Sequence, residues 1–271
     1  MKVLLIGLGN MGKNHKRVTQ KLLQTTPHEF KTCDANRNLD ADFLDYKEGI
    51  KEMKPDFVLI ATTTETHGEI LDVCINEGIK NVFVEKPIID VGDASKYLKE
   101  KNTKIMVGHI ERYNPIVAKI KHLTEDKVID TIIATRSGLV KIEEDFNLHI
   151  DLCIHDSDVI QVLTRNKGNS LNIMSKSIQS NSCNLFFELN GTDCFLHADN
   201  KSPFKRREIK VMGPKYFIEG DYINQTVMMN GDVVDVTKSE PLVNELKAFF
   251  DRKYTYDDLK EAVKNLKIVK G

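Results

Sequence analysis

The chain has 271 residues, and its 39 basic and 40 acidic residues leave a formal net charge of -1. This balance excludes a general attraction for nucleic acid or anionic membranes, and no run approaches the roughly 18 apolar residues of a membrane helix. The five cysteines are scattered, odd in number and without a CxxC pair, which argues against a disulfide framework or a zinc site. We therefore predict a cytoplasmic protein of two domains, with no metal, nucleic acid or membrane as partner.

Short apolar runs alternate with helical patterns up to about residue 115. A further strand is predicted at Phe30–Cys33, and the apolar runs are Val3–Ile6, Phe57–Ile60, Val82–Val84 and Ile105–Val107. Such runs are typical of strands buried on both faces of a parallel sheet. Helical periodicity lies between them over Met11–Leu23, with Met11, Val18 and Leu22 on one face, and over Thr66–Gly78 and Asp90–Lys101. The alternation predicts a Rossmann domain, a doubly wound parallel α/β sheet, at residues 1–115.

Residues 116–271 follow a different pattern. A helix is predicted to open at Asn114-Pro115, β-type runs dominate 128–138 and 169–237, and one helix-like insert spans 151–165. Asn190-Gly191 and Asn230-Gly231 lie between apolar segments, which is a strong hairpin signal. Strands joined by tight turns are antiparallel, so we predict an α+β domain with a mostly antiparallel open sheet, followed by helices over about the last 30 residues.

A glycine-rich turn, GLGNMG, follows the first predicted strand directly and opens the first predicted helix. Glycine lets such a turn close, lets the backbone approach a pyrophosphate, and lets the helix pack on the strand. The helix amino terminus then offers unpaired N–H groups to phosphates. The turn therefore predicts a dinucleotide site that includes Gly7, Gly9, Asn10, Met11 and Gly12.

Asp34 ends the second predicted strand, about 20 residues after the turn, where dinucleotide-binding folds place an acid on the ribose. A carboxylate there accepts hydrogen bonds from both ribose hydroxyls and repels a 2′-phosphate, so Asp34 predicts NAD as the cofactor. Arg37 nearby is suited to stack on adenine or to soften this exclusion, which keeps NADP possible. The alternatives are a solvated turn acid at position 34 and a merely exposed arginine.

Polar side chains end two further predicted strands. Glu85 and Lys86 follow Val82–Val84, at the edge where doubly wound sheets bind ligands. The alternative for this pair is a surface ion pair before a proline. Thr62, Thr63 and His67 end the preceding strand, where hydroxyls meet a nicotinamide ribose, or where His67 helps to cap the following helix.

A cluster of ionisable residues, DLCIHDSD, lies at 151–158. At helical spacing Asp151, His155 and Asp158 fall on one stripe. Carboxylates on both sides hold a histidine in one tautomer near physiological pKa, as a general base requires. A structural histidine and a metal site are the alternatives, although no second histidine has HExxH-like spacing.

Three motifs, GLGNMG at 7–12, VEKP at 84–87 and DLCIHDSD at 151–158, resemble in order and spacing the Gfo/Idh/MocA oxidoreductases. The resemblance spans both predicted domains. It implies that Lys86 and His155 act directly on substrate and that Asp151 contacts the substrate hydroxyl beside them. It also implies that Asp34 is the acid after the second strand and that Glu85 lies near the cofactor.

Two more segments, VGHIERYNP at 107–115 and GDYINQ at 220–225, are similar to the UDP-N-acetylglucosamine 3-dehydrogenase branch of that family. This implies that Arg112, Tyr113 and Asn114 line the substrate crevice. The expected activity is an NAD-dependent hydride transfer at a secondary hydroxyl of a sugar or nucleotide sugar. His155 would take the hydroxyl proton, Lys86 would stabilise the alkoxide, and Asp151 would hold an adjacent hydroxyl.

Other functions are compatible with the same motifs. One is reduction of an imine, a diol-derived ketone or a tetrapyrrole-like substrate, and another is a non-catalytic dinucleotide sensor. Independently of the reaction, the strand segments Asn184–Leu189 and Val227–Met229 are apolar enough to indicate burial by another subunit. We therefore predict a homodimer or homotetramer through the open sheet, in agreement with the family resemblance.

Overall fold

The computed structural model describes residues 1–89, 92–139, 149–165 and 170–270. The chain divides into two compact units. The first contains Met1–His109 and Leu242–Val263, and the second contains Ile110–Pro241 and Lys264–Gly271. This division differs from a boundary at residue 115, because the first unit ends earlier and regains a segment near the carboxyl terminus.

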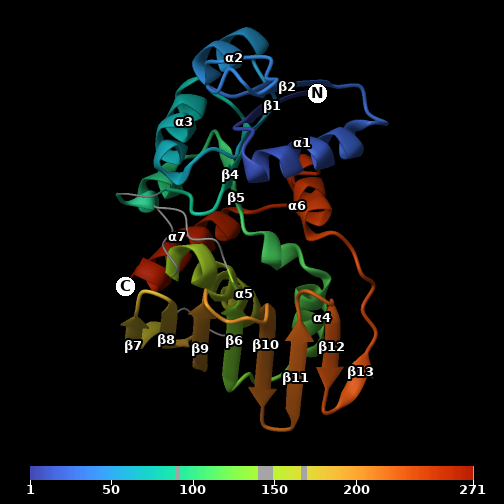
Figure 1. The fold of residues 1–271 in the computed structure, drawn as a ribbon, viewed down its shortest axis with the longest axis vertical. Coiled ribbons are helices and arrows are strands. Elements are labelled where there is room, and N and C mark those ends of the chain that lie inside the picture. The colour runs from blue at the N-terminus through green and yellow to red at the C-terminus, as the bar shows by residue number, and fades with distance from the viewer. Residues whose placement is uncertain (90–91, 140–148, 166–169, 271) are drawn as a thin grey trace. The chain divides into compact units, whose positions relative to one another are not determined.

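The described part of the first unit is built on a five-stranded sheet in the order β2-β1-β3-β4-β5 (Figure 1). The strands are β1 (Lys2–Ile6), β2 (Glu29–Cys33), β3 (Phe57–Ile60), β4 (Asn81–Glu85) and β5 (Lys104–Gly108). Helices α1 (Asn10–Leu23), α2 (Tyr46–Met53) and α3 (Thr64–Asn76) connect them, and a 3₁₀ helix, η1 (Ala94–Lys99), precedes β5. All pairs are parallel, and β1 pairs with both β2 and β3. The predicted doubly wound Rossmann fold is thus confirmed.

Two local predictions in this unit are wrong. The described part of the helical pattern, residues 92–101, forms only the short η1, because Gly92 takes a left-handed φ of 92° and Asp93 caps the helix that begins after it. In α1 the buried face includes Gly12, His15 and Val18 rather than Met11, which is 36% exposed. A Cβ at Gly12 would lie 2.0 Å from the Gly7 oxygen, so this close approach determines which face of α1 packs inward.

The carboxyl-terminal return to the first unit is explained by aromatic packing. Helix α6 (Pro241–Phe250) carries Phe249, whose ring contacts Phe57 and Phe83 edge to face at centroid distances of 5.3 and 5.6 Å. Beyond it, the Tyr254 hydroxyl donates to Asn81 Oδ1 at 3.1 Å. These contacts tie Leu242–Val263 to β3 and β4, and the following helix, α7 (Tyr256–Lys270), continues into the second unit.

The described part of the second unit holds an eight-stranded sheet in the order β13-β12-β11-β10-β6-β9-β8-β7 (Figure 1). Its strands are β6 (Thr131–Ser137), β7 (Leu171–Ile178), β8 (Ser182–Leu189), β9 (Thr192–Asp199), β10 (Arg206–Gly213), β11 (Tyr216–Asp221), β12 (Thr226–Met229) and β13 (Asp232–Val234). Of the recorded pairs, only β6 with β9 is parallel. Left-handed φ values at Asn190, Gly191, Asn230 and Gly231 confirm both predicted hairpins.

Among the residues that the structure describes, helices cover one face of this sheet and leave the other open. Helix α4 (Pro115–Leu123) packs on β11 and β12, and α5 (Ile154–Thr164) packs on β6 and β9. Along β8 and β9 buried side chains alternate with exposed or half-exposed ones, as expected for an antiparallel sheet with a single covered face. None of the described helices combines the length and the apolar character needed to cross a membrane.

Candidate functional site

The glycine turn between β1 and α1 is shaped for close backbone contact. Gly7 has a φ of 96°, and a Cβ added there would lie 2.5 Å from the Ala61 oxygen. Gly12 is held against Gly7, whereas a Cβ at Gly9 would meet no atom within 4 Å. The first and third glycines therefore close the turn, and the second leaves open space beside the start of α1. This arrangement fits the pyrophosphate of a dinucleotide.

Asp34, directly after β2, is tied to that turn. Its Oδ2 accepts a hydrogen bond from the Leu8 amide at 2.7 Å, and its Oδ1 accepts one from the Asn36 amide at 2.9 Å. A carboxylate oxygen has two lone pairs, so both oxygens retain capacity for ribose hydroxyls. Arg37 is exposed. The half-buried carboxylate fits a dinucleotide without a 2′-phosphate.

Glu85 ends β4 as a buried carboxylate with a partner that the sequence analysis missed. His15 on α1 is fully buried, and its Nε2 lies 2.7 Å from Glu85 Oε1. Burial alone would raise the Glu85 pKa, but the hydrogen bond and charge interaction with His15, followed by Lys86, hold it below its usual value. Lys86 is half-buried, and its amide donates to Glu85 Oε2 at 3.2 Å. The strand end thus holds an anion beside a lysine.

His67 contacts the main-chain oxygens of two loops through its two ring nitrogens. The imidazole is buried, with Nδ1 2.8 Å from the Pro87 oxygen and Nε2 3.2 Å from the Thr62 oxygen. It therefore joins the loops that follow β3 and β4. Thr63 is the exposed residue preceding α3, and the Thr62 hydroxyl accepts from Thr66 Oγ1 at 2.8 Å. Contacts of these threonines and of His67 with a cofactor stay predictions.

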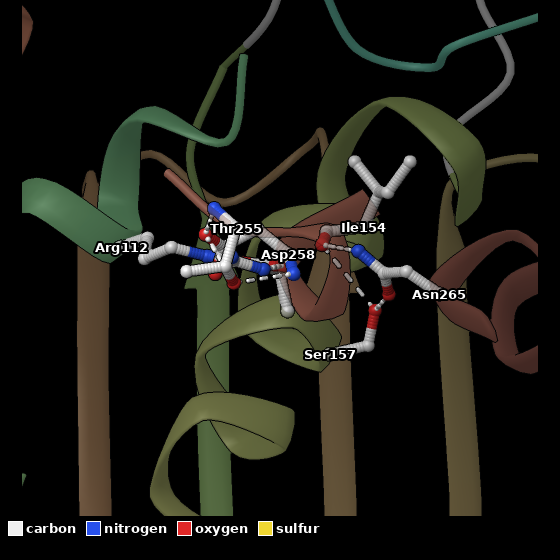
Figure 2. A network of polar contacts seen from close by, with 7 residues as sticks. Arg112, Ile154, Ser157, Thr255, Asp258 and Asn265 are labelled. Carbon is white, nitrogen blue, oxygen red and sulfur yellow. Dashed lines mark hydrogen bonds and ion pairs between the residues drawn. The ribbon is translucent and has the colours of Figure 1, made fainter. Parts of the chain in front are cut away.

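In the second unit, Asp151 and His155 lie where a π-helical turn, η3 (His149–Cys153), passes into α5. Both side chains are half-buried, and their catalytic roles stay predictions. Asn265 on α7 holds the start of α5 through two hydrogen bonds (Figure 2). Its side-chain amide donates to the main-chain oxygen of Ile154 at 2.8 Å, and its Oδ1 accepts from Ser157 Oγ. These two bonds fix the helix turn that carries His155.

The remaining polar motif residues of the second unit form a buried ionic cluster. Arg136 on β6, 1% exposed, donates from Nε to Asp156 Oδ2 at 2.9 Å and from Nη1 to Glu111 Oε1 at 3.1 Å. Burial raises the pKa of Asp156, and the Arg136 guanidinium opposes that rise. Arg112 Nε donates to Asp158 Oδ2 at 3.0 Å in a second, neighbouring pair. We refer to Glu111, Arg112, Arg136, Asp156 and Asp158 as the ionic cluster.

Asn114 and Tyr222 complete the surroundings of the ionic cluster. Asn114 is the N-cap of α4, where its Oδ1 accepts from the Ile116 amide at 3.3 Å. Its Nδ2 donates to the main-chain oxygen of Tyr222 at 3.2 Å. Burial, followed by the nearby carboxylates Asp156 and Glu111, raises the Tyr222 pKa well above its usual value. The motifs at 107–115, 151–158 and 220–225 therefore meet in one place. The structure ties Arg112 and Asn114 to internal partners, and their contact with substrate, like that of half-buried Tyr113, stays a prediction.

Sequence reasoning missed two residues that these contacts depend on, and both had a signal. His15 follows Gly12 by three positions, which places it on the same helix face as the glycine that packs on β1. Arg136 continues the period-two pattern of Ile132 and Ala134, which are buried, so a charged residue stands at a core position. A charge at a core position predicts a buried partner.

A doubly wound parallel sheet with a glycine turn between its first strand and first helix is the arrangement of dinucleotide-binding domains. Residues 1–109 match the family model of the Gfo/Idh/MocA group, described as an oxidoreductase family with an NAD-binding Rossmann fold. This match covers the first 109 of the 271 residues, and the dinucleotide named in the description of that family's Rossmann fold is NAD.

Two named relatives are similar in sequence. A myo-inositol 2-dehydrogenase from Thermotoga maritima is 23% identical over 183 residues, which cover 60% of this chain and 54% of that protein. A UDP-N-acetylglucosamine 3-dehydrogenase from Acidithiobacillus ferrooxidans is 21% identical over 281 residues, which cover 93% of this chain and 88% of the relative.

Solved structures match the fold over nearly the whole chain. The Acidithiobacillus ferrooxidans UDP-N-acetylglucosamine 3-dehydrogenase has a TM-score of 0.82 at 19% identity, covering 99% of this chain and 96% of that one. An oxidoreductase from Agrobacterium radiobacter, solved with NAD+, L-tartaric acid and magnesium, has a TM-score of 0.82 at 14% identity, covering 100% and 94%. At these identities the structural likeness establishes the shared fold.

Proposed function

We propose that the protein is an NAD-dependent dehydrogenase that transfers hydride between nicotinamide and a secondary hydroxyl of a sugar or nucleotide sugar. UDP-N-acetylglucosamine, oxidised at carbon 3, is the first candidate substrate. The observation that carries this proposal is the position of Lys86. It directly follows the buried end of β4, at the same edge of the sheet as the turn that fits a dinucleotide pyrophosphate.

Three residues of this chain have separate roles in the proposed reaction. NAD, when bound, supplies the hydride acceptor. Lys86 places a positive charge on the substrate oxygen, which stabilises the alkoxide as negative charge develops. His155 takes the hydroxyl proton on an imidazole nitrogen, and Asp151 accepts a hydrogen bond from an adjacent hydroxyl and so fixes the ring. In the reverse direction the same groups support reduction of a ketone.

The names of the relatives support a polyhydroxylated ring as substrate. One relative is named for myo-inositol and the other for UDP-N-acetylglucosamine, and each offers secondary hydroxyls on a six-membered ring. The test is a panel of UDP-sugars and free polyols with NAD, monitored by the absorbance of reduced nicotinamide. We expect turnover with UDP-N-acetylglucosamine or a close analogue. Absence of turnover with every sugar and polyol, in a chain that binds NAD, would contradict the proposal.

A homo-oligomer built through the open face of the second sheet is part of the proposal. In register across the strands of that face lie Phe186, Phe195 and Ile133, followed by Lys210 and Glu219. The rings of Phe186 and Phe195 stack at a centroid distance of 4.3 Å, and Phe195 is 40% exposed. An apolar patch with a paired lysine and glutamate beside it suits a second copy of the same sheet.

Light scattering tests this assembly. We expect a dimeric or tetrameric mass at micromolar concentration, and a monomeric mass for Phe195→Glu, which places a charge in the apolar patch. Leu44→Glu changes a comparably exposed apolar residue of the first unit and serves as the matched control. A monomeric wild type would contradict the proposal.

A reducing cytoplasm remains the proposed compartment, supported by five buried free cysteines.

A further inference from the structure

The buried pair of His15 and Glu85 has no role in the mechanism above. We propose that His15 is a positioning residue of the dinucleotide site. By holding the Glu85 carboxylate ionised at the end of β4, His15 makes the site favour oxidised nicotinamide, which is positively charged, over the neutral reduced form. This inference rests on the proposed function, because it assumes that the adenosine half of NAD lies at the end of β2 and the nicotinamide half at the ends of β3 and β4.

The pair is costly to bury, which argues for a role beyond packing. His15 is 0% exposed on the face of α1 that packs on the sheet, and its ring meets Phe83 edge to face at 5.1 Å. Removing an ionisable pair from water is offset by its mutual attraction only when the geometry is good, and apolar replacements are often at least as stable. Apolar residues at both position 15 and position 85 would therefore suit the core equally well.

Three elements hold the Glu85 carboxylate. From α1, His15 Nε2 contacts Oε1 at 2.7 Å, and after β4 the Lys86 amide donates to Oε2 at 3.2 Å. From β5, Gly108 approaches so closely that a Cβ there would lie 3.1 Å from Oε2 and 2.7 Å from Phe83 Cζ. His15 and Lys86 are the recorded ionisable neighbours, and the buried His109 follows Gly108. The carboxylate is thus fixed in place.

The sheet order directs the nicotinamide towards this carboxylate. The glycine turn after β1 takes the pyrophosphate, and Asp34 after β2 takes the adenosine ribose. The other half of the dinucleotide therefore extends to the opposite side of β1, over β3 and β4. His15 is only five residues beyond the start of α1, about 7 Å along the helix, so Glu85 lies within a nucleoside's length of the pyrophosphate turn.

A fixed carboxylate at that distance discriminates between the two oxidation states of the cofactor. The oxidised ring carries one more positive charge than the reduced ring, and their interaction with a buried anion differs accordingly. If Glu85 takes up a proton, this discrimination is lost. Burial raises the pKa of Glu85 and His15 opposes that rise, so removing His15 shifts the pKa of Glu85 upward and favours its protonated form.

The experiment measures the dissociation constants of NAD+ and NADH, without sugar, for the full chain and four variants at pH 6.5 and pH 9. Binding of NADH is followed by its own fluorescence, and the chain contributes no tryptophan fluorescence because it contains no tryptophan. Glu85→Gln removes the charge, His15→Phe removes the donor but keeps a ring beside Phe83, and His15→Gln keeps an amide donor. His122→Phe is the matched control, because His122 pairs with Glu125 at 3.9 Å on the surface of α4.

We expect Glu85→Gln to lower the affinity for NAD+ relative to NADH about tenfold at both pH values. His15→Phe should lower this ratio in the same direction, and by more at pH 6.5 than at pH 9, because a raised Glu85 pKa leaves more of the carboxyl protonated at the lower pH. His15→Gln and His122→Phe should keep the wild-type ratio within about threefold at both pH values.

An unchanged ratio in Glu85→Gln or His15→Phe would overturn the inference, as would an equal loss of affinity for both nucleotides in His15→Phe at both pH values. A wild type that binds neither nucleotide would overturn the inference and the proposed function together. Failure of the proposed function alone has a different signature, namely the expected shift in ratio with no hydride transfer across the sugar panel.

Discussion

The nucleotide-binding motif residues of the first unit and the residues of the ionic cluster in the second unit differ in how their polar groups are used. In the first unit, Gly9 faces open space and Asp34 keeps lone pairs beyond its two main-chain contacts, so the motif retains capacity for a ligand. In the second unit, Glu111, Arg112 and Asp158 bind other side chains of the chain in buried ion pairs. The comparison teaches that a motif identifies either a ligand site or an internal scaffold, and that burial and partners distinguish the two.

The largest expected effect falls on the two residues assigned to the chemistry, one in each unit. Lys86→Met and His155→Asn should each slow single-turnover hydride transfer at least about a hundredfold, with NAD affinity changed only a few-fold. The wild-type rate of alcohol oxidation should rise with pH as the base loses its proton, and this rise should vanish or move in His155→Asn. Exposed Lys99→Met and His28→Asn are the controls. Near-normal hydride transfer in both test variants would make these residues structural.

The ionic cluster sharpens the comparison through stability. Arg136→Met leaves Asp156 and Glu111 buried without their common cation, and we expect a loss of about 3–5 kcal/mol in the free energy of unfolding, measured by urea denaturation of the full chain. Lys96→Met in the first unit breaks an exposed pair with Asp72 and should cost less than about 1 kcal/mol. Equal costs for the two variants would show that the cluster is not the scaffold described here.

Cofactor choice tests whether Asp34 is available to a ligand. Two charges about 4 Å apart repel by roughly 4 kcal/mol at an effective dielectric of about 20, before screening. We expect the wild type to bind NAD at least about tenfold tighter than NADP, and Asp34→Ser to reduce this preference to about threefold or less. Asp40→Ser, an exposed acid of the same loop, should keep the preference. Tighter binding of NADP by the wild type would contradict the assignment.

The smallest expected effect concerns Asn114, which sequence similarity assigns to substrate and the structure assigns to a helix cap. Asn114→Ala should cost about 1–2 kcal/mol of stability, similar to Asp45→Ala, which removes the N-cap of α2. The Michaelis constant for the sugar should stay within about threefold. A tenfold rise in that constant without loss of stability would show that Asn114 acts in the substrate site.

Local signals explain what the sequence predicted well. The glycine turn and the hairpins at Asn190-Gly191 and Asn230-Gly231 depend on backbone conformations that few residue types adopt, so a handful of neighbouring residues determines them. The continuous apolar runs of β1 and β3 likewise predict, without reference to other segments, that these strands are buried.

Contacts between distant segments explain what the sequence did not predict. Phe249 returns to β3 and β4 because three aromatic rings pack together, and no pattern within α6 indicates which sheet it covers. His15 contacts Glu85 across a sequence separation of 70 residues, and Arg136 binds Glu111 across a separation of 25 residues. In each case the residue type alone signals that a partner is needed, and only the fold shows which residue supplies it.

The transfer of a single hydrogen atom tests the central claim most directly. UDP-N-acetylglucosamine carrying deuterium on carbon 3 is incubated with NAD and the full chain, and the nicotinamide product is examined by mass spectrometry and NMR. The account predicts one deuterium on carbon 4 of the reduced nicotinamide for each sugar oxidised. Sugar that keeps its deuterium, or deuterium that is released to water while NAD stays oxidised, would contradict it.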